Sequence, residues 1–177
     1  MRLRLNQSGR SMIEVITALL VIALLAAIAT PSFITLRNAL ATMALMSDLC
    51  SHLELTRSAA VTRRTDALMC PLGVDRQCAD TYDWSRGWLI YLDPDGNRSP
   101  DRDSDIIFSH ELKVTDHTRL STSQGRKQIR YLSTGRTATS NATFHICSGT
   151  SLKGRVTLNV SGRVRFSRPT LPTACPF

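Results

Sequence analysis

The sequence predicts an α+β protein in which one long N-terminal helix packs on an antiparallel β-sheet head domain. Two periodicities carry this prediction. Apolar residues follow helical spacing from about residue 13 to 61, and later segments change to short runs of β-branched and aromatic residues separated by Gly, Asn, Asp and Pro. A chain of 177 residues, 42% of them hydrophobic and 20% charged, has material for one such head.

The helix begins with an apolar run from Met12 to Ala29, about the minimum length that crosses a bilayer. Arg2, Arg4 and Arg10 precede it, so the positive-inside rule keeps the N-terminus in the cytoplasm and sends the rest outward. On this run alone two interpretations stay open: a membrane anchor, and a secretory signal peptide cut after Ala29.

Two features favour the anchor. Glu14 lies inside the apolar run, where a charge costs roughly 2 to 3 kcal/mol and is expected to have a partner. A glutamate that merely reaches water at the membrane edge is the alternative. Beyond Pro31 an apolar stripe continues in register to about Val61, which no cleaved signal peptide would need. The stripe consists of Phe33, Leu36, Leu40, Met43, Met46, Cys50 and Leu53.

The head domain is expected to consist of short strands that pack on the second half of the helix. Strands are predicted at residues 67–70, 87–92, 105–108, 111–114, 129–132, 143–147 and 155–160, with a turn and a final strand from Gly162 to Phe166.

Five cysteines in a chain with an export segment indicate an oxidising compartment, with up to two disulfides and one free thiol. Cys70 and Cys78 fit a short loop, and Cys175 fits a bond that holds the C-terminal tail to Cys147. Cys50, in the helical pattern, is the candidate free thiol. The pairing itself stays open, and zinc is the rival interpretation, although no pair has the spacing of a zinc knuckle.

Positive charge is concentrated in the last third of the chain. Residues 117–177 hold ten Lys or Arg and no Asp or Glu, while the other 116 residues hold 12 basic and 14 acidic groups. Such a distribution predicts a polyanionic partner. The alternative is a set of solvated charges that keep a sheet edge from pairing with other chains.

No catalytic chemistry is predicted. None of the four histidines lies in a nucleophile, metal or phosphate-loop motif, so the sequence predicts no enzyme, no cofactor and no metal site. The Asp-rich stretch from Asp93 to Asp105 admits calcium in principle, but Asp93-Pro94-Asp95-Gly96 is first of all turn chemistry.

The N-terminus resembles the type III signal of type IV pilins. Gly9 is followed by Arg10 and, five residues after the glycine, by Glu14, with Pro31 where pilins commonly have a helix-kinking proline. The resemblance implies that a prepilin peptidase cuts between Gly9 and Arg10. It also implies that Glu14 pairs with the terminal amine of a neighbouring pilin, which makes a buried charge tolerable. Arg10 replaces the phenylalanine that is usual, and usually methylated, at this position.

The order of landmarks in the head resembles the FimT/GspH branch of pilin-like proteins. These landmarks are Arg57-Ser58-Ala59-Ala60, Gly87-Trp88-Leu89-Ile90-Tyr91, Thr143-Phe144-His145-Ile146-Cys147 and Gly162-Arg163-Val164-Arg165. The resemblance implies a leader at 1–9, a transmembrane and polymerisation helix at 10–30, its amphipathic half at 31–64 and a periplasmic head at 65–177. The protein would lie in the inner membrane before it joins a pilus fibre at the cell surface.

The Gly162 to Arg165 segment (GRxR) implies DNA binding, since this element is associated with uptake of exogenous DNA in FimT-like minor pilins. Alternation predicts Arg163 and Arg165 on one open face, with Val164 and Phe166 toward the core. Contacts to double-stranded DNA would involve phosphates and be sequence-independent. Further candidates are Arg168, Lys153 and Arg155, with Arg126, Lys127 and Arg130 as a possible extension. The other hypotheses are a purely structural pilus-priming subunit, a GspH-like pseudopilin of a type II secretion system, and a secreted binding domain cut after Ala29.

Overall fold

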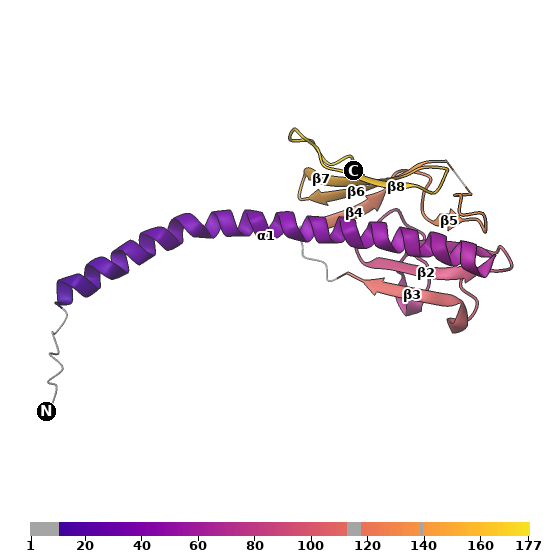
Figure 1. Ribbon diagram of the computed structural model, residues 1–177, viewed down its shortest axis with the longest axis horizontal. Coiled ribbons are helices and arrows are strands. Elements are labelled where there is room, and N and C mark those ends of the chain that lie inside the picture. Colours follow the sequence, from indigo (N-terminus) through magenta and orange to yellow (C-terminus); the bar gives the residue numbers. More distant parts are fainter. Residues whose placement is uncertain (1–10, 113–117, 139) are drawn as a thin grey trace, which may run out of the picture. The chain divides into compact units, whose positions relative to one another are not determined.

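The computed structural model describes residues 11–112, 118–138 and 140–177. Helix α1 (Met12–Arg63) comes first, and eight strands follow it (Figure 1). They are β1 (Asp66–Pro71), β2 (Gly87–Asp93), β3 (Ile106–Glu111), β4 (Thr118–Thr122), β5 (Ile129–Tyr131), β6 (Ala142–Ser148), β7 (Ser151–Leu158) and β8 (Val164–Ser167). Two short 3-10 turns lie at Val74–Arg76 and Asp103–Asp105.

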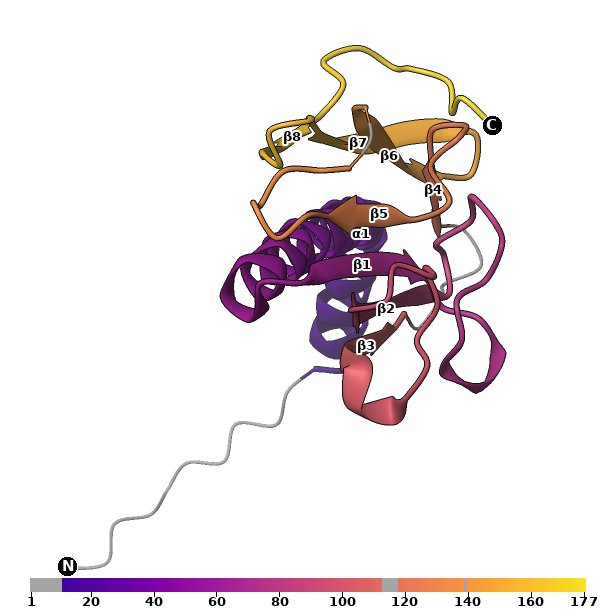
Figure 2. The same ribbon diagram turned by 90° about the vertical axis from the view of Figure 1, so that its right-hand side faces the viewer.

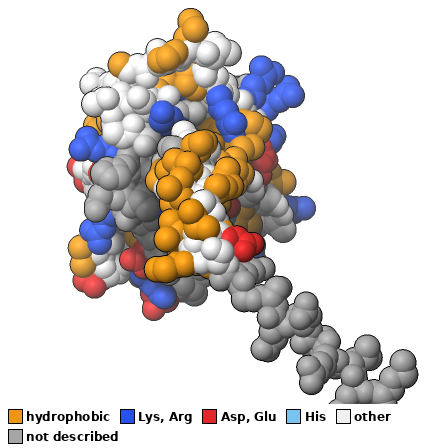
Figure 3. All heavy atoms as spheres, turned by 90° about the vertical axis from the view of Figure 1, so that its left-hand side faces the viewer, with side chains coloured by type: hydrophobic (Ala, Val, Ile, Leu, Met, Phe, Trp, Pro, Cys, Tyr) orange, Lys and Arg blue, Asp and Glu red, His pale blue; other side chains and the backbone are white. Residues whose placement is uncertain are grey.

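Helix α1 confirms the predicted continuous helix to within two residues at each end, since it runs through Pro31 to Arg63. It is long and apolar enough, by length and composition, to cross a membrane. The chain divides into two compact units between Ala41 and Thr42. In the first unit the described apolar side chains of α1 are exposed, and they gather at the centre of Figure 3.

The second unit contains two antiparallel sheets, where the sequence predicted one. Their strand orders are β3-β2-β1-β5 and β4-β6-β7-β8. Figure 2 shows both sheets around the helix, whose second half supplies Leu45, Met46, Leu49, Leu53 and Ala60 to the core. The helix therefore has an apolar surface wide enough to be covered by strands of both sheets.

The strand predictions differ from the structure at three places. The predicted strands 105–108 and 111–114 are replaced by the single strand β3, and residues 113 and 114 lie outside the described range. Strand β4 was not predicted, because Leu120 is its only apolar residue. Strand β7 begins at Ser151 and ends at Leu158, whereas the prediction placed it at 155–160.

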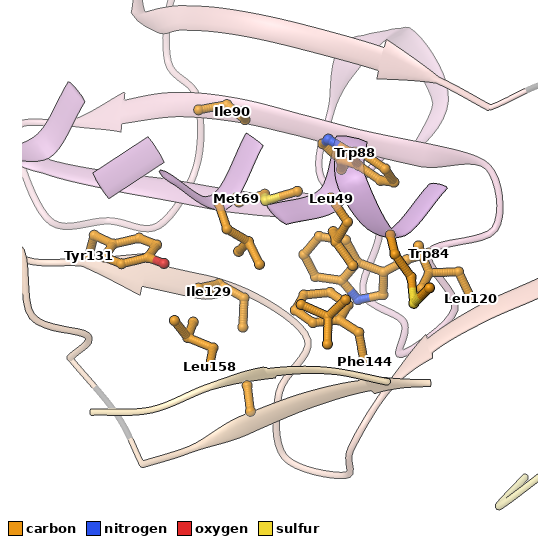
Figure 4. Packing of buried hydrophobic residues seen from close by; sticks show 14 of the residues in the cluster. Leu49, Met69, Trp84, Trp88, Ile90, Leu120, Ile129, Tyr131, Phe144 and Leu158 are labelled. Atoms are coloured by element: carbon orange, nitrogen blue, oxygen red, sulfur yellow. The ribbon is translucent and has the colours of Figure 1, made fainter. Parts of the chain in front are cut away.

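The core lies where the helix meets both sheets (Figure 4). Trp84 and Phe144 are fully buried and meet edge to face, with ring centroids 5.0 Å apart. Trp88 is also fully buried, and its indole Nε1–H donates to Nδ1 of His52 on the helix at 3.2 Å. These contacts join the helix to the sheets that position the functional surface.

Candidate nucleic-acid interface

The β7–β8 hairpin carries Arg163 in its loop and Arg165 on β8, and Asn159 organises the loop. The Gly162 N–H donates to the carbonyl of Asn159 at 2.9 Å. The side-chain oxygen of Asn159 accepts hydrogen bonds from the Arg163 N–H at 2.9 Å and the Ser161 hydroxyl at 2.7 Å. An asparagine at the start of a tight turn commonly bonds the backbone ahead of it in this way. The loop therefore holds Arg163 by its backbone.

Gly162 is required by the backbone geometry of this loop. Its φ is +81°, in the left-handed region that favours glycine. A Cβ at this position would overlap the carbonyl oxygen of Gly135 and lie 3.2 Å from Nε of Arg57. Gly162, predicted as part of the DNA-binding element, thus has a structural role here: it lets the loop pack against Gly135 and the end of helix α1.

The register of the second sheet brings basic side chains from β7 and β8 onto its outward face. Burial alternates along β7, with Gly154, Val156 and Leu158 toward the core and Lys153 and Arg155 exposed. Arg165 pairs with Thr157, and Arg155 pairs with Ser167, so Arg155 and Arg165 are diagonal neighbours on the outward face. Diagonal Cβ atoms in a sheet lie roughly 7 Å apart.

Five cations define what we call the basic face: Lys153, Arg155, Arg163, Arg165 and Arg168. All five are exposed, and none forms an ion pair with a carboxylate of the described residues. Their charge is therefore not neutralised by a described neighbour. The sequence offered these five residues as DNA-binding candidates on separate segments, from alternation and from the GRxR resemblance. The structure places those segments side by side as β7, β8 and the residues next to them.

The predicted extension of the basic face was wrong for two of its three residues. Lys127 binds Asp80 at 2.7 Å, and Arg130 binds Asp66 at 2.6 Å, so their charges are paired within the protein. Arg130 also lies on β5, which belongs to the other sheet. Arg126 donates to the backbone carbonyl oxygens of Gly125 and Asn141 and to the Ser140 hydroxyl.

The register of β8 places Phe166 on the core side of the sheet, as alternation predicted, but its side chain is not buried there. Val164 packs partly against the core, but the side chain of Phe166 is 68% exposed. Phe166 lies on the same side of the sheet as its partner Val156, which is fully buried. Strand β8 is at the sheet edge and has a neighbour on only one side, so the core side of this strand is only partly covered.

The head contains two disulfides. Cys70 bonds Cys78, and Cys147 bonds Cys175, the pairing that the sequence spacing favoured but left open. Cys50 is free and half-buried. Burial and the nearby Glu54 raise the pKa of the Cys50 thiol. The second disulfide attaches the C-terminal tail to the outward side of the second sheet.

The tail is also bonded through its backbone. The Leu152 N–H donates to the carbonyl of Thr173 at 2.9 Å, and the Cys175 N–H donates to the carbonyl of Thr150 at 2.8 Å. The ring of Phe177 contacts His145 edge to face at 6.4 Å between centroids. The tail therefore ends over β6, close to β4, as the C-terminal end in Figure 2 shows.

The Asp-rich loop after β2 is held by hydrogen bonds between its own side chains. Asp93 is 2% exposed, and its carboxylate accepts the Arg98 N–H at 3.3 Å. The amide nitrogen of Asn97 donates to the carboxylates of Asp95 and Asp101. Burial raises the pKa of Asp93. Within the described ranges no group of three His, Cys, Asp or Glu side chains has a metal-binding arrangement.

The predicted assembly residues lie at the start of the chain. Gly9 and Arg10 lie outside the described residues. Glu14 is in the first turn of α1, and its side chain is exposed. A carboxylate in the first helical turn interacts favourably with the helix dipole. None of the described residues buries the Glu14 side chain.

The architecture defines the class of protein: a long N-terminal helix whose second half packs on antiparallel sheets is the type IV pilin fold. Two crystal structures of the type IV minor pilin FimU from Pseudomonas aeruginosa are similar to this chain, with TM-scores of 0.58 and 0.55 and 16% and 15% sequence identity. Each match covers 74% of this chain, and they cover 91% and 96% of the FimU chains.

Residues 46–162, more than half of the chain, match the family described as Type II transport protein GspH. The chain belongs to this family. It is therefore a minor pilin or pseudopilin, of a type IV pilus or a type II secretion system. No curated protein matches the sequence significantly. The predicted FimT/GspH resemblance and the predicted fold are both confirmed.

Proposed function

We propose that this chain is a minor pilin that binds DNA without sequence preference through its basic face, for DNA uptake in natural transformation and for pilus biogenesis. One observation supports DNA binding above all: five exposed cations without described carboxylate partners lie on and around two adjacent strands at a sheet edge. Such a surface attracts phosphates and releases the counterions of DNA on binding.

The arginines suit phosphate contacts by their geometry as well as by their charge. A guanidinium offers planar paired donors to phosphate oxygens, and four of the five cations are arginines. Arg163 and Arg165 are two residues apart along an extended chain, which spaces them by about 7 Å. The chain is proposed to act by binding and assembly and not as an enzyme.

Assembly is proposed to follow from the N-terminus. A prepilin peptidase removes residues 1–9, residues 10–30 anchor the chain in the inner membrane, residues 31–64 form the amphipathic half of the helix, and residues 65–177 form the periplasmic head. In the filament, Glu14 then pairs with the terminal amine of another pilin, and the basic face is carried to the cell surface.

DNA binding is tested by a mobility-shift titration with the full chain in neutral detergent, at two salt concentrations. The Arg163→Ala/Arg165→Ala double variant is expected to bind more weakly than the wild type, and the difference is expected to shrink at high salt. Arg102→Ala is the matched control, because Arg102 is an exposed arginine in a loop of the other sheet. Equal shifts for all three proteins would reject the basic face as the DNA site.

The family match favours a second candidate, a pseudopilin of a type II secretion system. The basic face would then contact another filament subunit. Affinity purification of the chain from its native host separates the two functions: recovery of pilus subunits supports the first, and recovery of secretion-system subunits supports the second.

A further inference from the structure

A groove of about 620 Å³ lies on the outward side of the second sheet, over β4 and β6. It is formed by the loop 81–83, by β4 with residues 123–124, by His145 of β6 and by the last two residues, Pro176 and Phe177. Its volume is within the range of roughly 300 to 1,000 Å³ that is usual for small-ligand sites. The second disulfide and the tail hydrogen bonds hold one wall in place.

The groove offers aromatic surface and uncharged polar groups. Tyr82 is 36% exposed and Phe177 52% exposed, so both rings are accessible. The hydroxyl oxygen of Ser121 is buried and has no hydrogen-bond partner among the described residues. Because that oxygen has almost no accessible surface, the polar groups within reach of a ligand are those at the groove surface, such as the exposed side chain of Gln124.

The charges around the groove disfavour a phosphate inside it. None of its lining residues is Lys or Arg. Asp83, the one acidic side chain in the lining, accepts the Ser85 N–H at 2.9 Å. Burial and the nearby Arg155 lower the pKa of His145, which therefore presents a neutral ring at neutral pH. A flat, uncharged group with polar edges fits this lining.

The groove is continuous with the basic face through the strand register. Ser121 on β4 pairs with His145 on β6, and His145 pairs with Arg155 on β7. Arg155 is in turn the diagonal neighbour of Arg165. Adjacent strands are about 4.8 Å apart, so β8 and β4 are separated by roughly 14 Å. A chain whose phosphates contact Arg155 and Arg165 can therefore extend across the sheet to the groove.

We propose that this groove seats an unpaired nucleobase of a DNA strand whose phosphates lie on the basic face. This inference rests on the proposed DNA-binding function and makes it specific: single-stranded or frayed DNA gains a contact that a closed duplex lacks. Base stacking on Tyr82 or Phe177 supplies the contact.

The test measures fluorescence anisotropy with the full chain in neutral detergent and three probes. These are a short single-stranded oligonucleotide, the same strand with abasic sites and the matching duplex. Tyr82→Ala and Phe177→Ala are each expected to weaken binding of the intact single strand about tenfold and to leave the abasic and duplex probes unchanged. Tyr82→Phe keeps the ring and is expected to bind as the wild type does. Leu171→Ala, an exposed apolar residue of the tail outside the groove, is the control.

The outcomes separate this inference from the function on which it rests. If DNA binding depends on Arg163 and Arg165 but Tyr82→Ala binds the single strand normally, the nucleobase site is rejected and the DNA-binding function stands. If the wild type binds no probe, both are rejected. Quenching of tyrosine fluorescence by a neutral oligosaccharide, with no response to nucleosides, would assign the groove to a saccharide and overturn the proposal. Near-ultraviolet circular dichroism confirms that each variant is folded.

Discussion

The Gly162→Ala substitution tests the claim that the glycine of the GRxR segment is there for packing and not for DNA contact. Alanine at a φ of +81° costs about 1 to 2 kcal/mol, because its Cβ approaches the following carbonyl. The same Cβ meets the carbonyl oxygen of Gly135 and the side chain of Arg57, and overpacking of this kind adds about 1 to 3 kcal/mol. The variant is therefore expected to lose about 2 to 5 kcal/mol of stability.

Gly125→Ala is the matched control for this prediction. Gly125 has a nearly identical φ of +79°, but a Cβ there would meet nothing within 4 Å. Only the conformational cost of about 1 to 2 kcal/mol applies. The assay is thermal or urea unfolding of the full chain in detergent, followed by near-ultraviolet circular dichroism of the buried tryptophans. Equal destabilisation of the two variants would refute the packing argument, because it would leave no energy for the contact with Gly135.

Three further predictions concern stability. The Cys147→Ser/Cys175→Ser double variant is expected to lose about 2 to 4 kcal/mol, because the bond restricts the unfolded chain. Unfolding of the variant and of the wild type, both without reductant, provides the comparison, since a thiol reductant would also cleave the Cys70–Cys78 bond. Equal stability would mean that the second disulfide adds nothing. Burial, with nearby His110, lowers the pKa of His52, so the folded state binds a proton at His52 less readily than the unfolded state does. The free energy of unfolding is therefore expected to fall as the pH drops below about 6.5. The His52→Gln variant is expected to show a smaller fall when unfolding is measured from pH 7 to 5. Asp66→Asn is expected to cost about 1 to 3 kcal/mol of stability, because the Asp66 side chain in its ion pair with Arg130 is only 18% exposed. Asp80→Asn is expected to cost less than about 1 kcal/mol, because the Asp80 side chain in its pair with Lys127 is 85% exposed. The reverse order in urea unfolding would contradict this account.

The helix and most strands follow from local patterns in the sequence. The apolar stripe predicted a helix that the structure extends by only one or two residues at each end. The prediction was accurate because both halves of the helix have apolar residues at the same three-to-four-residue spacing. Strand β4 escaped prediction for a physical reason. Ser121 and Thr122 are buried, and the loop 81–83 pairs with this strand through the Thr122 N–H and the Asp83–Ser121 bridge; local alternation does not report burial by distant segments.

Part of the basic face was predictable and part was not. Alternation places Lys153 and Arg155 on one side of β7, and the structure agrees. The pairing of Lys127 and Arg130 with carboxylates from β1 and the loop before β2 depends on contacts across more than 45 positions, which no local pattern reports. The exposure of Phe166 likewise depends on β8 being an edge strand.

Sequence reasoning also missed the residues that shape the hairpin loop. Asn159 precedes Gly162 by three positions, and this spacing is a recognised turn signal that would have found it. The contact of Arg57 with Gly135 and Gly162 has no such signal, because it joins three distant segments.

The salt dependence of DNA affinity tests the central claim most directly. If the five cations of the basic face each contact a phosphate, log K for duplex DNA is expected to fall against log salt concentration with a slope of about −4 to −5. The Arg163→Ala/Arg165→Ala variant is expected to reduce the steepness by about 2. A slope near zero for the wild type, or the same slope for both proteins, would contradict the account.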